Sequence, residues 1–138
     1  MLARLRRLVG LERRAAAGAW GEAEAAAWLE GQRGFHILAR NWRNPRDRRS
    51  ELDLVARDRE VLVFVEVKTR ARSGAIRPAL AVNRDKRRLV RKAAWHWHRR
   101  IGNPRIPLRF DIVELVLQEG SPPRVQRLRD AFGWNEAQ

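Results

Sequence analysis

The chain has 138 residues, 44% of them hydrophobic, which suits a single globular domain with a substantial core. It contains no cysteine, which excludes disulfides and thiolate zinc sites, so a reducing compartment is expected. Thirty basic residues against sixteen acidic ones give a formal charge of +14. Such an excess favours a polyanion as partner.

The basic residues are mostly arginine, since only Lys68, Lys86 and Lys92 are lysines. Arginine binds phosphate through paired N–H donors, so nucleic acid is the favoured polyanion. These donors bind the phosphates of DNA and RNA alike, so arginine by itself leaves the choice between the two open. The alternatives are an anionic membrane surface and a merely well-solvated surface. No apolar run approaches the roughly 20 residues of a membrane span, and the N-terminus lacks the apolar stretch of a secretory signal. A cytoplasmic protein is therefore expected.

The first half of the chain predicts one helix and three strands. Residues 1–17 mix leucine and arginine and form a basic arm or a helix start. An alanine- and glutamate-rich stretch predicts a helix from about Gly18 to Glu30, with Trp20, Ala23 and Ala27 on its buried face and Trp28 as a further candidate. Strands are predicted at residues 35–40, 51–56 and 61–69, the last two forming an antiparallel hairpin.

The second half predicts a helix and one or two strands. Asn83 is expected to cap a helix that ends near Arg100 and turns a basic face outward. That face comprises Arg84, Lys86, Arg87, Arg88, Arg91 and Lys92. A strand is predicted at residues 108–117, and a weaker edge strand at 124–128 after Pro122 and Pro123. The order αβββαβ, with this further β, implies an α/β domain over residues 18–132, a mixed central sheet flanked by helices, and a tail at 133–138.

The most informative residues are Glu66 and Lys68, which lie in a run of strand-forming residues. Side chains alternate along a strand, so both should share one face, with the valines at 61, 63, 65 and 67 on the other, core-facing side. Asp53 occupies the preceding predicted strand. Two carboxylates and a lysine on adjacent strands are the groups needed to bind a divalent metal and position a water.

Mg²⁺ or Mn²⁺ is the expected cofactor, because magnesium takes hard oxygen ligands and often only one or two carboxylates. Asp53, Glu66 and the Val67 carbonyl are the candidate ligands. Lys68 is expected to orient the attacking water or to stabilise developing charge. Glu22 and Glu51 are further carboxylates within reach.

Simpler interpretations compete with this one. Glu66 and Lys68 alone could form a surface ion pair worth about 0–1 kcal/mol. Glu22 could merely complement a helix dipole, and Glu51 is expected to balance charge rather than to bind metal. His96 and His98 point to different helix faces, so no histidine metal site is predicted.

Several blocks of the sequence resemble the YraN-like family of uncharacterised bacterial proteins. They are Gly21-Glu22 with Ala25 and Leu29, then residues 34–43, 51–56 and 63–70, then Lys86, Ala93-Ala94, Arg109-Phe110-Asp111 and Ala131-Phe132. That family is similar to archaeal Holliday-junction resolvases and has the restriction-endonuclease-like fold. The resemblance implies a site of Asp53, Glu66 and Lys68, with Glu22 as an additional helix carboxylate. Ser50 departs from the glycine that the family usually has before the glutamate.

The sequence thus predicts a metal-dependent nuclease that hydrolyses phosphodiester bonds in DNA, including branched or otherwise non-standard DNA. The candidate nucleic-acid-binding residues are Arg43, Arg48, Arg49, Arg70, Arg72, Lys86 and Arg87. A resolvase-like role would favour a homodimer, by analogy alone. The alternatives are a non-catalytic nucleic-acid-binding module with the same fold, and a basic accessory protein that acts through protein partners.

Overall fold

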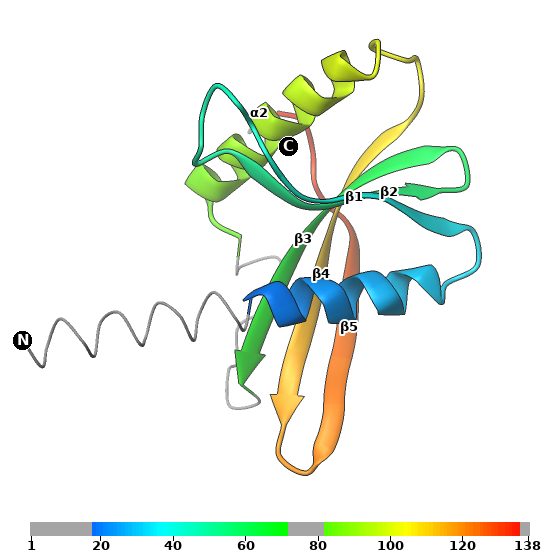
Figure 1. The fold of residues 1–138 in the computed structure, drawn as a ribbon, viewed down its shortest axis with the longest axis vertical. Coiled ribbons are helices and arrows are strands. Elements are labelled where there is room, and N and C mark those ends of the chain that lie inside the picture. The colour runs from blue at the N-terminus through cyan, green and yellow to red at the C-terminus, as the bar shows by residue number, and fades with distance from the viewer. Residues whose placement is uncertain (1–17, 72–81, 136–138) are drawn as a thin grey trace, which may run out of the picture.

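The computed structural model describes residues 18–71 and 82–135, where a mixed sheet lies between two helices (Figure 1). Arg72, a predicted nucleic-acid contact, lies outside these residues. Residues 18–30 are helical, and α2 spans Arg84–Arg100. The strands are β1 Phe35–Arg43, β2 Glu51–Asp58, β3 Val61–Ala71, β4 Leu108–Gln118 and β5 Ser121–Phe132. The predicted mixed α/β fold and its order of elements are confirmed.

The strands pair in sequence order, β1-β2-β3-β4-β5, and every pairing is antiparallel except that of β3 with β4. The parallel pairing requires a long crossover, and the chain from β3 to β4 passes through α2. The hairpin predicted for β2 and β3 is confirmed. No described helix is long and apolar enough to cross a membrane.

The final strand begins earlier than expected. Pro122 and Pro123 were predicted to precede it, but both lie within β5, which starts at Ser121. Proline cannot donate a ladder hydrogen bond, so it is tolerated where a strand forms the edge of a sheet. Because β5 is the last strand in the sheet order, it tolerates the prolines, and its pairing with β4 shifts register beside them, from Val116 with Arg124 to Gln118 with Ser121.

Two hydrophobic clusters cover the two faces of the sheet. Phe64 packs with Val90 and Ala93 of α2 on one face. On the other face, Val63 packs with Ala25 and Leu29 of the N-terminal helix. The prediction that the valine side of β3 alone faces the core was therefore incomplete. A central strand covered by helices on both faces buries both sets of side chains.

The N-terminal helix buries a different stripe from the one predicted. Gly21, Ala25, Ala26 and Leu29 are buried, whereas Ala23 and Ala27 are exposed and Trp20 is 40% exposed. Trp28, the further candidate for the buried face, is partly buried against the core. The prediction for Trp20, Ala23 and Ala27 was wrong because an alanine-rich helix offers little hydrophobic contrast between its faces. The observed stripe brings the helix backbone at Gly21 directly against β3.

Helix α2 begins as predicted, with the Asn83 side chain accepting a hydrogen bond from the Lys86 N–H (2.9 Å). Its basic face is only partly exposed. Arg91 was placed on the outer face but is buried, with Nε donating to the Gly133 carbonyl (2.6 Å) and the guanidinium over the Phe132 ring. A long side chain can bury its stem and satisfy its charged end on backbone, which a count of charges does not show.

The feature of the fold that positions the site is a fork in the sheet. Strands β2 and β3 pair only as far as Leu54 and Val65. The β1–β2 pairing continues to Glu51, and the β3–β4 pairing to Ala71. Beyond the fork, β2 stays with β1 while β3 stays with β4, and the two halves of the sheet diverge (Figure 1).

Gly21→Ala should lower the free energy of unfolding by about 1–3 kcal/mol, the usual cost of overpacking. A Cβ at this position would lie 2.5 Å from the Thr69 Oγ1 atom of β3. Chemical denaturation measures the change. Gly18→Ala is the matched control, since a Cβ there meets nothing within 4 Å. Adding Thr69→Ala should restore most of the loss, and equal effects of the two glycine substitutions would contradict this packing.

Candidate metal and phosphodiester site

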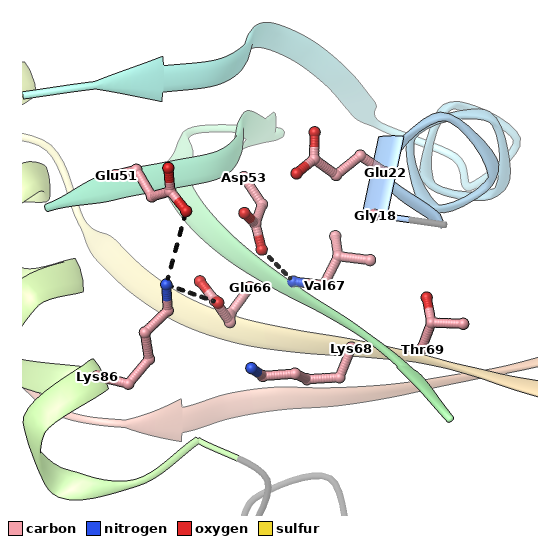
Figure 2. Close-up of a pocket in the computed structure, with 9 residues that line it drawn as sticks. All are labelled: Gly18, Glu22, Glu51, Asp53, Glu66, Val67, Lys68, Thr69 and Lys86. Atoms are coloured by element: carbon pink, nitrogen blue, oxygen red, sulfur yellow. Dashed lines mark hydrogen bonds and ion pairs between the residues drawn. The ribbon is translucent and has the colours of Figure 1, made fainter. Parts of the chain in front are cut away.

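The fork places Asp53 and Glu66 where the β2–β3 ladder would otherwise continue. Both side chains are buried, Asp53 at 8% exposure and Glu66 at 3%. With no partner on β2, the Val67 N–H donates instead to Asp53 Oδ2 at 2.8 Å (Figure 2). A buried backbone donor must be satisfied, so this bond fixes the aspartate at the opening between the strands.

The Val67 backbone also faces this opening. In an antiparallel strand the N–H and C=O of one residue point toward the same neighbouring strand. Since the Val67 N–H reaches Asp53 on β2, its carbonyl faces the same gap. Val67 lines the pocket there.

A pocket of about 380 Å³ gathers the predicted residues. It is lined by Gly18, Glu22, Glu51, Asp53, Glu66, Val67, Lys68, Thr69 and Lys86. In Figure 2, Glu22 projects from the N-terminal helix toward Asp53, while Glu66 and Lys68 come from β3. The structure therefore brings Glu22, Asp53, Glu66 and Lys68 into one pocket, and their catalytic roles stay predictions.

Lys86 lies in this pocket rather than on the outward face of α2. Its Nζ is 3.5 Å from Glu66 Oε1 and 3.9 Å from a Glu51 carboxylate oxygen. Burial alone would lower the pKa of Lys86, but the Glu66 and Asp53 carboxylates outweigh it and raise that pKa. Its position in a basic run suggested a surface residue, and only the docking of α2 beside the fork shows otherwise.

The buried carboxyl pair holds a proton more tightly than free carboxyls do. Burial, and then the neighbouring Asp53 charge, raise the pKa of Glu66 to about 8 against the pull of Lys86 and Lys68. Burial also raises the pKa of Asp53, although the Val67 N–H works in the opposite direction. Two close carboxyls in a low-dielectric site favour one shared proton, and a divalent cation would relieve the same repulsion.

Glu22 is linked to this pair. Burial raises the pKa of Glu22 to about 7, and the Asp53 carboxyl beside it contributes to the rise. A glutamate that only complemented the helix dipole would be stabilised in its charged form, which lowers the pKa. The raised pKa of Glu22 instead reflects its burial first and the neighbouring Asp53 and Glu51 carboxyls second.

The donor set suits a hard divalent ion. No group of three or more His, Cys, Asp or Glu side chains in residues 18–71 and 82–135 is arranged to hold a metal. The carboxylates of Asp53 and Glu66 still match the donors of a magnesium site, because Mg²⁺ commonly takes one or two carboxylates and completes its shell with water and backbone oxygen. His98 hydrogen-bonds the Pro104 carbonyl (2.9 Å).

Ser50 and Glu51 support the site. Ser50 is fully buried, and its Oγ donates to the Leu89 carbonyl of α2 at 2.6 Å. The departure from glycine at this position therefore ties the chain before β2 to the helix. Glu51 pairs with Arg43 (3.4 Å) as well as with Lys86 (3.9 Å), as expected of a charge-balancing residue.

The predicted nucleic-acid contacts fall into different environments. Arg48 and Arg49 are exposed, with Arg49 paired to Asp47 at 3.2 Å. Arg70 forms an ion pair with the buried Glu114. Arg87 donates to the Val82 carbonyl (2.9 Å) and lies over the Phe132 ring. Arg48 and Arg49 are therefore more accessible to a ligand than Arg70 and Arg87 are.

Comparison with known proteins identifies relatives of this chain. Residues 21–115 match the family described as "Uncharacterised protein family UPF0102", the YraN family that the sequence resembles. A UPF0102 protein of Anaeromyxobacter dehalogenans is 46% identical over 119 residues, covering 86% of this chain and 85% of that protein. UPF0102 proteins of Rhodococcus jostii and Geobacter sulfurreducens are each 43% identical, covering 85% and 83% of this chain and 96% and 87% of their own lengths.

The raised pKa values predict that the metal-free protein loses stability as pH rises from about 5 to 8. In that window the folded state keeps protons on Glu66 and Glu22 that the unfolded state has released, so the free energy of unfolding falls with pH. The expected scale is on the order of 1 kcal/mol per unit of pKa shift.

Urea denaturation in EDTA at several pH values measures this slope. Glu66→Gln should flatten it, because the amide does not titrate. A stability that rises over the same interval in the unmodified protein would contradict the arrangement of carboxyls described above.

Proposed function

Because this chain belongs to the uncharacterised protein family UPF0102, whose name assigns no activity, we propose its function from the site: a metal-dependent nuclease that hydrolyses phosphodiester bonds in DNA. The observation that carries this proposal is the fork, which buries Asp53 and Glu66 together beside Lys68. The net charge of +14 supports a nucleic-acid substrate.

The arrangement of the sheet supports a restriction-endonuclease-like fold, in keeping with the similarity of the YraN-like family to archaeal Holliday-junction resolvases. A mixed sheet with helices on both faces carries its acidic pair on two neighbouring central strands. On this proposal the substrate extends to branched DNA, the protein acts in the cytoplasm, and a homodimer would cut two strands symmetrically.

In the proposed mechanism, Asp53, Glu66 and the Val67 carbonyl would hold Mg²⁺ or Mn²⁺. When bound, the ion supplies Lewis-acid stabilisation of the phosphate oxygens. Lys68 shares the Glu66 face of β3, about 7 Å along the strand, and orients the attacking water or stabilises charge on the phosphate. Glu22 accepts hydrogen bonds from water beside Asp53.

Asp53→Asn should reduce cleavage by at least about a hundredfold, since it removes a ligand charge at the reacting centre. The assay is a cleavage screen over linear, nicked, flapped and four-way DNA with Mg²⁺ or Mn²⁺. Glu60→Gln, an exposed carboxylate in the β2–β3 turn, is the matched control. Equal cleavage by the Asp53 variant and the unmodified protein, or no cleavage of any substrate, would refute the proposed activity.

One observation favours a non-catalytic nucleic-acid-binding module instead. Lys86 already provides a cation 3.5 Å from Glu66, so the carboxylates could be retained as a buried ion pair that joins α2 to the sheet. Removing one partner from such a pair typically costs about 3–5 kcal/mol. On this view the pocket has a structural role only.

Calorimetric titration with Mn²⁺ or Mg²⁺ separates the two functions. A nuclease site should give a binding heat that Glu66→Gln abolishes, and Lys86→Met should tighten binding because it removes a competing cation. A binding module should show no such heat from the unmodified protein, and Lys86→Met should then only lower the free energy of unfolding.

A further inference from the structure

A second cavity, of about 350 Å³, lies at the C-terminal end of α2, away from the carboxylate pocket. It is lined by Arg46, His96, Arg99 and Arg100. His96, Arg99 and Arg100 are spaced i, i+3 and i+4, so they lie on neighbouring positions of one helix face. Arg46 reaches the same cavity from the loop between β1 and β2. The lining thus contains three arginines, and among residues 18–71 and 82–135 no carboxylate lines it.

Arg46 is held in place by the local structure of its loop. The Arg46 N–H donates to the Asn44 side-chain oxygen at 3.0 Å, and Asn44 is only 2% exposed. The Asn44 N–H in turn donates to the Ser50 carbonyl at 2.9 Å, which closes the loop on itself. Such a closed turn fixes the backbone from which Arg46 projects.

The loop is also clamped to α2. The Ser50 Oγ donates to the Leu89 carbonyl (2.6 Å), and the Lys92 Nζ lies 3.0 Å from Asp47 Oδ2. Two attachments along one helix hold the loop against it, so the cavity between Arg46 and the helix arginines is already formed. Because the backbone around the cavity is held in place, binding a ligand would require ordering of the arginine side chains only.

The charge of the cavity is not neutralised from within. Asp47, the acid of the loop, is engaged by Arg49 and Lys92. Arg46, Arg99 and Arg100 form no ion pair within the part of the chain that the structure describes. The convergence of unpaired guanidinium groups, which bind phosphate in bidentate fashion, marks an anion site.

A plainer explanation covers only part of this cluster. Cations in the last turn of a helix complement its dipole, which would account for Arg99 and Arg100. It does not account for Arg46, which comes from a different element and faces the same cavity. The partial negative charge at the C-terminal end of the helix repels an anion, so the arginine side chains would have to supply the binding free energy.

The clamped loop connects this cavity to the carboxylate pocket. It runs along α2 into β2, where Glu51 pairs with Lys86 in that pocket. Lys86 and the segment from His96 to Arg100 are 10–14 residues apart, which is about 15–21 Å along a helix. At 3.4 Å per base pair, this equals about five base pairs of duplex.

From this spacing, and resting on the proposed function, we infer that the cavity of Arg46, His96, Arg99 and Arg100 binds a backbone phosphate of duplex DNA. That phosphate lies about five base pairs from the phosphodiester at the carboxylate pocket. The exposed Arg48 and Arg49, in the loop that connects the two sites, lie along the same path. The cavity is thus a positioning site that sets how the duplex crosses α2.

The test is the variant Arg99→Gln with Arg100→Gln, compared with Arg124→Gln with Arg129→Gln, which removes two exposed arginines from the edge strand β5. Binding of a fluorescent DNA duplex is measured over a range of salt concentrations. The first variant should bind at least about tenfold more weakly, and its salt dependence should be shallower by about 1–2 in log–log slope. The β5 variant should change little.

Further readouts separate this inference from the proposed function. The cavity variant should keep the binding heat for Mn²⁺ and the rate at saturating DNA, while raising the DNA concentration needed for half that rate. If both double variants weaken binding equally, or neither does, the cavity is not a phosphate site, whatever the nuclease assay shows. If the unmodified protein binds no DNA at low salt, the inference and the nuclease proposal both fail.

Discussion

The separation of β2 from β3 beyond Leu54 and Val65 is the constraint on which the rest of this structure depends. A strand that leaves its neighbour exposes a backbone N–H, and a buried N–H needs an acceptor. Asp53 accepts the hydrogen bond from the Val67 N–H. This bond holds the aspartate at the place where the two strands separate. Glu66, the residue before Val67, is buried at the same opening.

The pocket is lined mainly by acidic residues, whereas the protein as a whole is strongly basic. Four carboxylates and two lysines line it, although the chain as a whole carries +14. Concentrating acids in a buried site is costly unless cations compensate them, as the raised pKa values of Glu22 and Glu66 indicate. A strongly basic surface around an acidic pocket suits a polyanion that must be held next to a cation.

The two helices cover opposite faces of the sheet, and each contributes a side chain to the pocket at the fork. The N-terminal helix approaches β3 closely at Gly21 and thereby brings Glu22 to Asp53, while α2 contributes Lys86. The loop before β2 is fastened to α2 through Ser50, so the helix and the strand that carries Asp53 are held together. Small residues and buried hydrogen bonds thus set the geometry of the charged groups.

The sequence by itself determined the mixed α/β fold, the hairpin of β2 and β3, the Asn83 cap and the family, because strand runs, capping residues and matched blocks are local patterns. It also singled out Glu66 and Lys68 by their alternation along one strand, and Asp53 by its place on the preceding predicted strand. Only the tertiary structure decided that Lys86 faces the carboxylates, that Arg91 is buried and that Gly21 lies in the packed face of its helix. These outcomes depend on how the helices rotate and dock on a forked sheet, and contacts between residues distant in the chain carry no local signal in an alanine- and arginine-rich sequence.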